Sequence, residues 1–147
     1  MVRRGLALSL LLTLAACAGS PSANQEADAA AKRFDQPDPE RGALYIYRSG
    51  LFGVARPLDV AVVNGVQAKL GYNTYLRIEG PPGPVEVACK AGDKTASQQV
   101  DIAPGQTRFV RTSMTAGLWG PNCEVAEVPP DEGQAAVRSG RRVEPQQ

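Results

Sequence analysis

The sequence predicts an all-β domain, an antiparallel β-sandwich of about seven or eight strands, on three observations. From residue 42 onward, short runs of alternating or wholly apolar residues recur between turn signals, as they do in sandwiches. The turns are marked by pairs such as Asn64-Gly65 and Pro104-Gly105. The chain also holds 15 glycines and 12 prolines but only 5% aromatic residues, a composition typical of short elements joined by many turns.

The first strands follow from the apolar pattern. Residues 43–48 are almost wholly apolar, which predicts a strand that is covered on both faces. Residues 58–63 alternate and lead into Asn64-Gly65, the strongest short-range signal of a β-hairpin. Residues 66–70 are then the return strand of that hairpin. Residues 74–79 form the next predicted strand, which ends at a Gly-Pro-Pro-Gly turn.

The second half of the domain continues the alternation. Val85, Val87 and Cys89 alternate with polar or small residues, so Cys89 is expected to face the core. Residues 97–103 and 107–113 flank Pro104-Gly105, the pair that favours a type II turn. Residues 123–128 are the last predicted strand.

The predicted β-sandwich domain spans residues 42–140, with polar segments on both sides. Residues 17–41 contain little apolar surface and predict a flexible tether with a reach of roughly 25–30 Å. Residues 132–138 follow Pro-Pro-Asp and predict a short C-terminal helix. Residues 141–147 are expected to be a disordered tail.

The first 16 residues have the layout of a secretory signal. Arg3 and Arg4 precede a short apolar run that ends in small residues before Cys17. The run is shorter than the about 20 residues that span a bilayer, which argues against an uncleaved transmembrane helix. An ordinary secretory signal would not need a cysteine directly after its small residues.

Leu14-Ala15-Ala16-Cys17 resembles the processing box of bacterial lipoproteins. That resemblance implies that the signal peptide, residues 1–16, is cleaved and that Cys17 carries a diacylglyceryl group and an N-terminal acyl chain. Ala18 is not the aspartate that retains such lipoproteins in the inner membrane. The expected location is therefore the periplasmic face of the outer membrane, with the inner membrane as the alternative.

Two cysteines remain once Cys17 is assigned to lipid. In an oxidising compartment, Cys89 and Cys123 are expected to form a disulfide. A redox pair or half of a metal site are the alternatives. Redox pairs usually show Cys-x-x-Cys spacing, and a metal site needs more Cys or His than the chain offers.

The order of these features resembles a family of bacterial lipoprotein domains, domain of unknown function 2846. Its opening strand is similar to Leu44–Arg48, and its second strand and turn are similar to Val60–Gly65. The later similarities are Tyr72–Tyr75, Pro81–Gly83, Ile102–Gln106 and Arg108–Arg111, with Phe109 where the family tends to have tyrosine. The resemblance covers about residues 43–128 and implies a β-sandwich lipoprotein without indicating a reaction. The family pattern does not include the Cys89–Cys123 pair.

Composition and charge argue against several functions. The chain has no histidine, and its 16 basic and 15 acidic residues show no basic stretch typical of nucleic-acid binding. We therefore predict no nucleic-acid partner, no cofactor, no metal and no enzymatic activity. The residues considered for catalysis and set aside are Lys69, Lys90, Lys94, Ser97, Ser113 and the acidic pairs Glu124–Glu127 and Asp131–Glu132.

Two loops are candidate binding sites. Phe52 lies in an apolar loop over residues 49–57, which either folds back on the end of the sandwich or exposes a patch for a protein or lipid. Trp119 lies in a loop over residues 115–122 and either plugs the core or binds a sugar ring or protein. Arg48 is expected to pair with a carboxylate such as Asp59 or Glu79.

The predicted protein is a lipid-anchored envelope module, structural or protein-binding, with a sandwich of the immunoglobulin-like or transthyretin-like kind. Its partners would be the membrane, through the N-terminal lipid, and envelope proteins or peptidoglycan. The alternative function is binding of glycan or peptidoglycan through residues 49–57 and 115–122.

Overall fold

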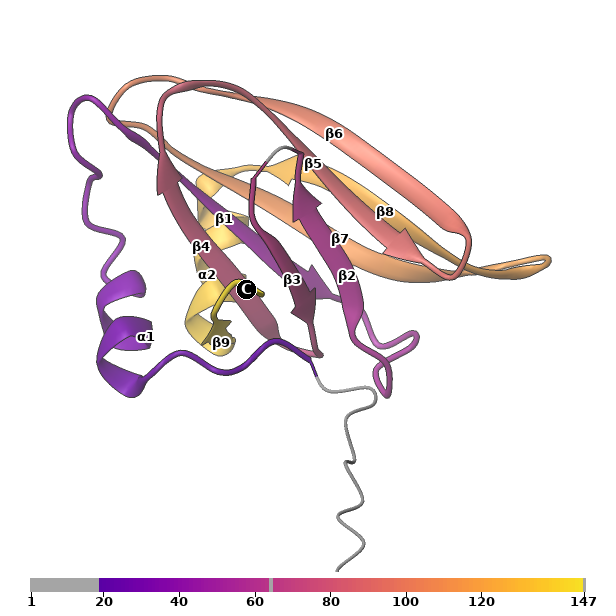
Figure 1. Ribbon diagram of the computed structural model, residues 1–147. Coiled ribbons are helices and arrows are strands. Elements are labelled where there is room, and N and C mark those ends of the chain that lie inside the picture. Colours follow the sequence, from indigo (N-terminus) through magenta and orange to yellow (C-terminus); the bar gives the residue numbers. More distant parts are fainter. Residues whose placement is uncertain (1–18, 64, 147) are drawn as a thin grey trace, which may run out of the picture.

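A computed structural model describes residues 19–63 and 65–146 (Figure 1). Two sheets face each other, which confirms the predicted β-sandwich. The five-stranded sheet has the order β8-β7-β1-β4-β9 and the four-stranded sheet the order β3-β2-β5-β6. The strands are β1 (Gly42–Ser49), β2 (Leu58–Val62), β3 (Gln67–Leu70), β4 (Thr74–Gly80), β5 (Gly83–Ala91), β6 (Lys94–Ile102), β7 (Thr107–Gly117), β8 (Gly120–Val128) and β9 (Arg141–Val143); the helices are α1 (Gln25–Ala31) and α2 (Pro130–Ser139).

The five-stranded sheet is mixed, which corrects the expectation of a purely antiparallel fold. β1 pairs in parallel with β7, and β4 pairs in parallel with β9. The turn at Pro104-Gly105 carries the chain from one sheet to the other, so β7 starts beside the start of β1. Hydrogen bonds fix this start, from the Gly105 amide to the Arg41 carbonyl at 2.7 Å and from the Ala43 amide to the Gln106 carbonyl at 2.9 Å. Gly105 has a φ of 71°, which suits the predicted type II turn.

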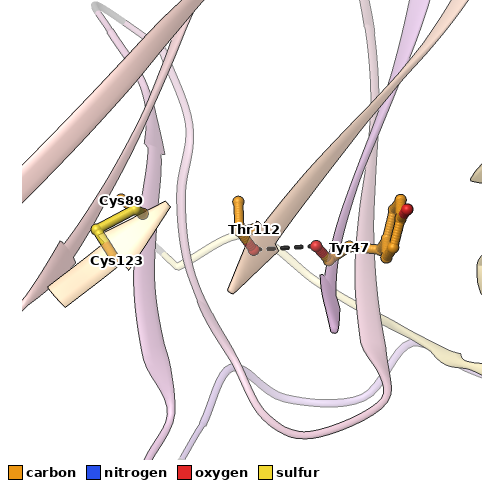
Figure 2. Close-up of a disulfide and its surroundings, with 4 residues drawn as sticks. All are labelled: Tyr47, Cys89, Thr112 and Cys123. Carbon is orange, nitrogen blue, oxygen red and sulfur yellow. Dashed lines mark hydrogen bonds between the residues drawn. A yellow bond between two sulfur atoms is a disulfide. The ribbon is translucent and has the colours of Figure 1, made fainter. Parts of the chain in front are cut away.

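The core between the sheets consists of aliphatic side chains at alternate strand positions. Ile46 and Val110 of the five-stranded sheet and Val60 and Val87 of the four-stranded sheet are all buried within it. The disulfide Cys89–Cys123 joins β5 to β8 across this core, with its Cα atoms 6.2 Å apart, so the predicted pairing is confirmed (Figure 2).

A second apolar cluster lies on the outer face of the five-stranded sheet, where both helices cover it (Figure 1). Tyr45, Tyr75 and Phe109 are its fully buried aromatic rings. α2 approaches the sheet so closely that a Cβ on Gly133 would lie 2.3 Å from the Phe109 ring. Because both faces are covered, β1 is buried along almost its whole length, as its apolar sequence predicts.

The segment predicted as a flexible tether is packed against the domain from residue 19 onward, which is a correction. α1 is capped by the Asn24 side chain, and Ala31 and Phe34 pack on the aromatic cluster. The Tyr45 hydroxyl donates to the Ala31 carbonyl at 2.7 Å. The prediction failed because the segment packs only a few apolar side chains, such as Ala31 and Phe34, and otherwise relies on polar contacts that an apolar pattern does not reveal.

The tail predicted to be disordered also belongs to the fold. β9 adds to the edge of β4, and Val143 is buried. The Glu144 amide donates to the Pro21 carbonyl at 2.8 Å, and the Gln146 amide donates to the Gln67 carbonyl at 2.7 Å. The domain therefore extends beyond the predicted limits of residues 42–140. The predicted C-terminal helix is confirmed as α2.

Asp28 connects the N-terminal segment to both the sheet and the C-terminal segment. Its carboxylate accepts hydrogen bonds from the Lys32 ammonium at 2.7 Å, the Tyr75 hydroxyl at 2.9 Å and the Arg142 amide at 2.8 Å. Burial is the largest single influence on the Asp28 pKa and raises it, but these hydrogen bonds together outweigh burial and lower the pKa below 3.8.

We expect Asp28→Asn to lower the free energy of unfolding by about 1–2 kcal/mol at pH 7, because the charge-assisted hydrogen bonds are lost. The pKa of Asp28 is lower in the folded than in the unfolded chain, so its stabilisation is present above about pH 4 and is lost as the pH falls toward the folded pKa. Urea unfolding between pH 2 and 7 measures both effects. Asp35→Asn, at an exposed ion pair, is the control and should change little. An equal acid dependence in wild type and Asp28→Asn would contradict the assignment.

Candidate functional site

Exposed apolar side chains lie at one end of the sandwich. This end holds the β1–β2 loop, the β3–β4 loop and the β7–β8 hairpin. Leu118 and Trp119, at the tip of the β7–β8 hairpin, are 95% and 93% exposed. Both predicted loops, 49–57 and 115–122, therefore lie at this end. We name it the apolar end; its exposed large apolar residues are Leu51, Phe52, Val54, Tyr72, Leu118 and Trp119.

The β1–β2 loop does not fold its large side chains into the core. Leu51 is 73% exposed and Phe52 48% exposed, so the expectation that they cap the sandwich is wrong. Instead, Gly53 packs on Met114, where a Cβ would lie 2.4 Å from the sulfur. Gly53 also has a φ of 67°, which favours glycine. The loop thus turns its backbone toward the domain and its apolar side chains outward.

Trp119 does not plug the core either. It lies between Gly117 and Gly120, which pair with each other at the end of the hairpin. A Cβ on Gly117 would lie 2.5 Å from the Gly120 carbonyl oxygen, so this close approach requires glycine. The hairpin therefore presents the indole to the surroundings.

Arg48 holds the β1–β2 loop in place. Its side chain is buried and donates to the carbonyl oxygens of Arg56, Leu70 at 3.0 Å and Gly53 at 2.7 Å. Burial lowers the pKa of the Arg48 guanidinium. The predicted carboxylate partners were wrong: Asp59 pairs with Lys69, and Glu79 pairs with Arg77. The Arg48 guanidinium therefore donates hydrogen bonds to backbone carbonyl groups of the β1–β2 loop and of β3 instead of pairing with an acid.

Behind Arg48, the end of β1 is tied to β7. The buried Thr112 hydroxyl donates to the Tyr47 carbonyl at 2.9 Å (Figure 2). The Tyr47 ring points away from the disulfide, toward the helices. Its hydroxyl donates to Glu132 of α2 at 3.2 Å, and burial, followed by the nearby Glu132 charge, raises the pKa of Tyr47 to about 12. The loop therefore rests on a rigid base.

The residues considered for catalysis are distributed over the fold. Glu127 of β8 forms an ion pair with Arg108 of β7, within the five-stranded sheet. Glu132 of α2 forms an ion pair with Arg111 of β7. Lys94 lies beside Asp93 in the β5–β6 turn. Within residues 19–63 and 65–146, no three His, Cys, Asp or Glu side chains gather in a way that suits a metal ion.

A hollow of about 430 Å³ lies on the outer face of the four-stranded sheet. Ala61 and Ala88 are among its lining residues, with Asp59, Lys69 and Lys90 beside them. Neither Phe52 nor Trp119 lines it, so it does not include the exposed aromatic side chains named above.

Cys17 and residues 1–16 lie outside the described residues, so the predicted signal peptide and lipidation are not placed by the structure. In the part of the chain that is described, no helix has the length and apolar character needed to cross a bilayer.

Comparison with known proteins gives a relative of undetermined function. No protein-family model matches the chain, so the resemblance to domain of unknown function 2846 stays a prediction. The chain is 22% identical to an uncharacterized protein of Haemophilus influenzae over 134 residues, which cover 91% of this chain and 80% of the relative. The similarity therefore extends over most of the chain.

Proposed function

We propose that the protein is a lipid-anchored module of the bacterial cell envelope, without catalytic activity, which is attached through Cys17 and serves a structural or protein-binding role. The observation that carries this proposal is the pairing of Cys89 with Cys123. The chain contains three cysteines, so this pair leaves only Cys17, at the end of the signal-like segment, for lipid. A buried disulfide also suits an oxidising compartment.

The periplasmic face of the outer membrane is the proposed location. Ala18 follows Cys17, whereas aspartate at this position retains lipoproteins in the inner membrane. The resemblance to domain of unknown function 2846 supports the same proposal, since it implies a lipoprotein. The short distance between the anchor and the folded domain would keep the domain at the membrane surface.

The exposed loops support a binding role over a catalytic one. Phe52 and Trp119 are presented on loops whose backbones are fixed, and large exposed apolar groups on a rigid base are typical of interaction surfaces. Trp119 is 93% exposed and stands out from the surface, while Phe52 is about half-exposed.

Metabolic labelling with palmitate tests the anchor. We expect the wild-type protein to be labelled, to lack residues 1–16 and to fractionate with the outer membrane. Cys17→Ser should be unlabelled and keep its signal segment, because the acylated sulfur is missing. The control is Cys89→Ser with Cys123→Ser, which should retain the label. A wild-type protein with a free, unmodified Cys17 would contradict the proposal.

Binding of glycan or peptidoglycan is the second candidate function, because the exposed Trp119 indole is able to stack on a sugar ring. Co-sedimentation with purified peptidoglycan that is lost in Trp119→Ala but kept in Val63→Ala would favour it. Val63 is the matched control, since it is exposed and lies at the opposite end of β2.

A further inference from the structure

The apolar end holds six of the seven large apolar residues that are exposed in the described chain. They come from three connections that are distant in sequence: the β1–β2 loop, the β3–β4 loop and the β7–β8 hairpin. The seventh, Val63, lies at the other end of β2. Exposed apolar residues scattered over a surface are ordinary, but their concentration at one end is typical of a surface that binds a protein or a membrane.

The described chain begins at this same end. The Ser20 amide donates to the Lys69 carbonyl at 3.0 Å, and the Lys69 amide donates to the Ser20 hydroxyl at 2.8 Å. A Cβ on Gly19 would lie 4.0 Å from the Cβ of Pro57, in the β1–β2 loop. Figure 1 shows the first described residues running beside the end of β3 and this loop.

The distance from this point to Cys17 is short. Gly19 is two residues after Cys17, and two residues of fully extended chain span at most about 7 Å. The predicted tether would have let the domain turn freely above the membrane. With Ser20 fixed to β3, a lipid on Cys17 would instead hold the apolar end within a few ångströms of the headgroups.

We propose that the apolar end docks on the phospholipid surface and that Leu51, Phe52, Leu118 and Trp119 enter the boundary between headgroups and acyl chains. This inference rests on the proposed lipidation of Cys17. Trp and Tyr are enriched at membrane interfaces because their rings are apolar and their edges polar, and this end carries Trp119 and Tyr72. Docking in this way would orient the domain. The last residues of β2, near Val63, and the first residues of β5, near Val85, would face away from the membrane.

Charge around the apolar end favours insertion over electrostatic attraction. Lys94 lies 4.0 Å from Asp93, and Asp59 pairs with Lys69 at 3.6 Å and lies opposite Lys90 in the strand register. Arg56 is also exposed there. Anionic surfaces attract basic residues, but the two acids offset part of this attraction. The docked state should therefore depend little on salt.

Trp119 is the only tryptophan of the chain, so its fluorescence reports directly on docking. The lipidated protein is reconstituted into vesicles of phosphatidylethanolamine and phosphatidylglycerol, with or without brominated acyl chains. We expect a blue-shifted emission that brominated lipid quenches and that 1 M salt leaves nearly unchanged. Leu51→Ser with Phe52→Ser should lower the quenching at least about twofold, because much of the inserted apolar area is removed. Val63→Ser should leave it unchanged.

Mass spectrometry of the same samples separates this proposal from the anchor. If Cys17 is acylated but Trp119 emits as in water and is not quenched, the protein is anchored without docking, and this inference is overturned. If Cys17 is not acylated, the proposed anchor fails, and the absence of quenching then overturns both. If Trp119 of the purified protein is shielded by added peptidoglycan but not by pure lipid, peptidoglycan covers this end, which also overturns the inference.

Discussion

Replacing Cys89 and Cys123 together by alanine should lower the free energy of unfolding by about 4 kcal/mol. The bond closes a loop with a sequence separation of 34 residues, and in the chain-entropy model such a crosslink restricts the unfolded chain by this amount. Both side chains are buried, so the loss of packed sulfur adds to the effect. A domain of this size has little stability to spare.

Urea unfolding followed by far-ultraviolet circular dichroism measures this change. The wild type in reductant should approach the stability of the double variant, since both lack the crosslink. Val63→Ala is a control for an exposed apolar substitution and should shift stability by less than about 0.5 kcal/mol. A double variant as stable as the oxidised wild type would show that the sheets do not depend on this bond.

The strands could be predicted from the sequence because their side chains follow the two faces of the sheets. The alternation of Val85, Val87 and Cys89 places Cys89 in the core, where it meets Cys123. The almost wholly apolar residues of β1 indicate burial on both faces, and the helices provide the second cover. Both signals are local, so they do not depend on knowing the rest of the fold.

The terminal segments could not be predicted because polar contacts between distant residues hold them. Asp28 joins Tyr75 and the Arg142 amide, which are far from it in sequence. Ser20 pairs with the backbone of Lys69. Hydrogen bonds to main-chain groups leave no pattern in the sequence, so a short polar segment that folds resembles one that does not.

The candidate site shows the same limit. The sequence identifies Phe52 and Trp119 as apolar residues in loops but does not indicate whether a loop turns them inward or outward. That outcome depends on the backbone, through the contact of Gly53 with Met114 and the approach of Gly117 to Gly120. The gathering of three loops at one end follows from strand pairing, which brings the end of β1 beside Ser113 of β7.

Arg48→Ala should lower the free energy of unfolding by about 3 kcal/mol and loosen the β1–β2 loop. The buried guanidinium satisfies carbonyl groups of Arg56, Leu70 and Gly53, and its removal leaves them without a donor. Arg48→Lys should recover only part of the loss, because one ammonium group cannot reach carbonyls on separate segments as the planar guanidinium does. Urea unfolding measures the stability, and hydrogen exchange over residues 50–57 measures the order of the loop.

Arg56→Ala is the matched control, because the Arg56 side chain is exposed and only its carbonyl takes part in the contact. It should leave both measurements nearly unchanged. If Arg48→Ala loses stability while exchange over residues 50–57 stays slow, Arg48 supports the core but does not hold the loop. If the loop does loosen, Phe52 must be ordered when the apolar end docks, and this ordering costs conformational entropy. We therefore expect brominated vesicles to quench Trp119 less in Arg48→Ala than in the wild type, although every apolar side chain of the apolar end remains. The buried cation would then determine how well the apolar end docks without touching the membrane itself.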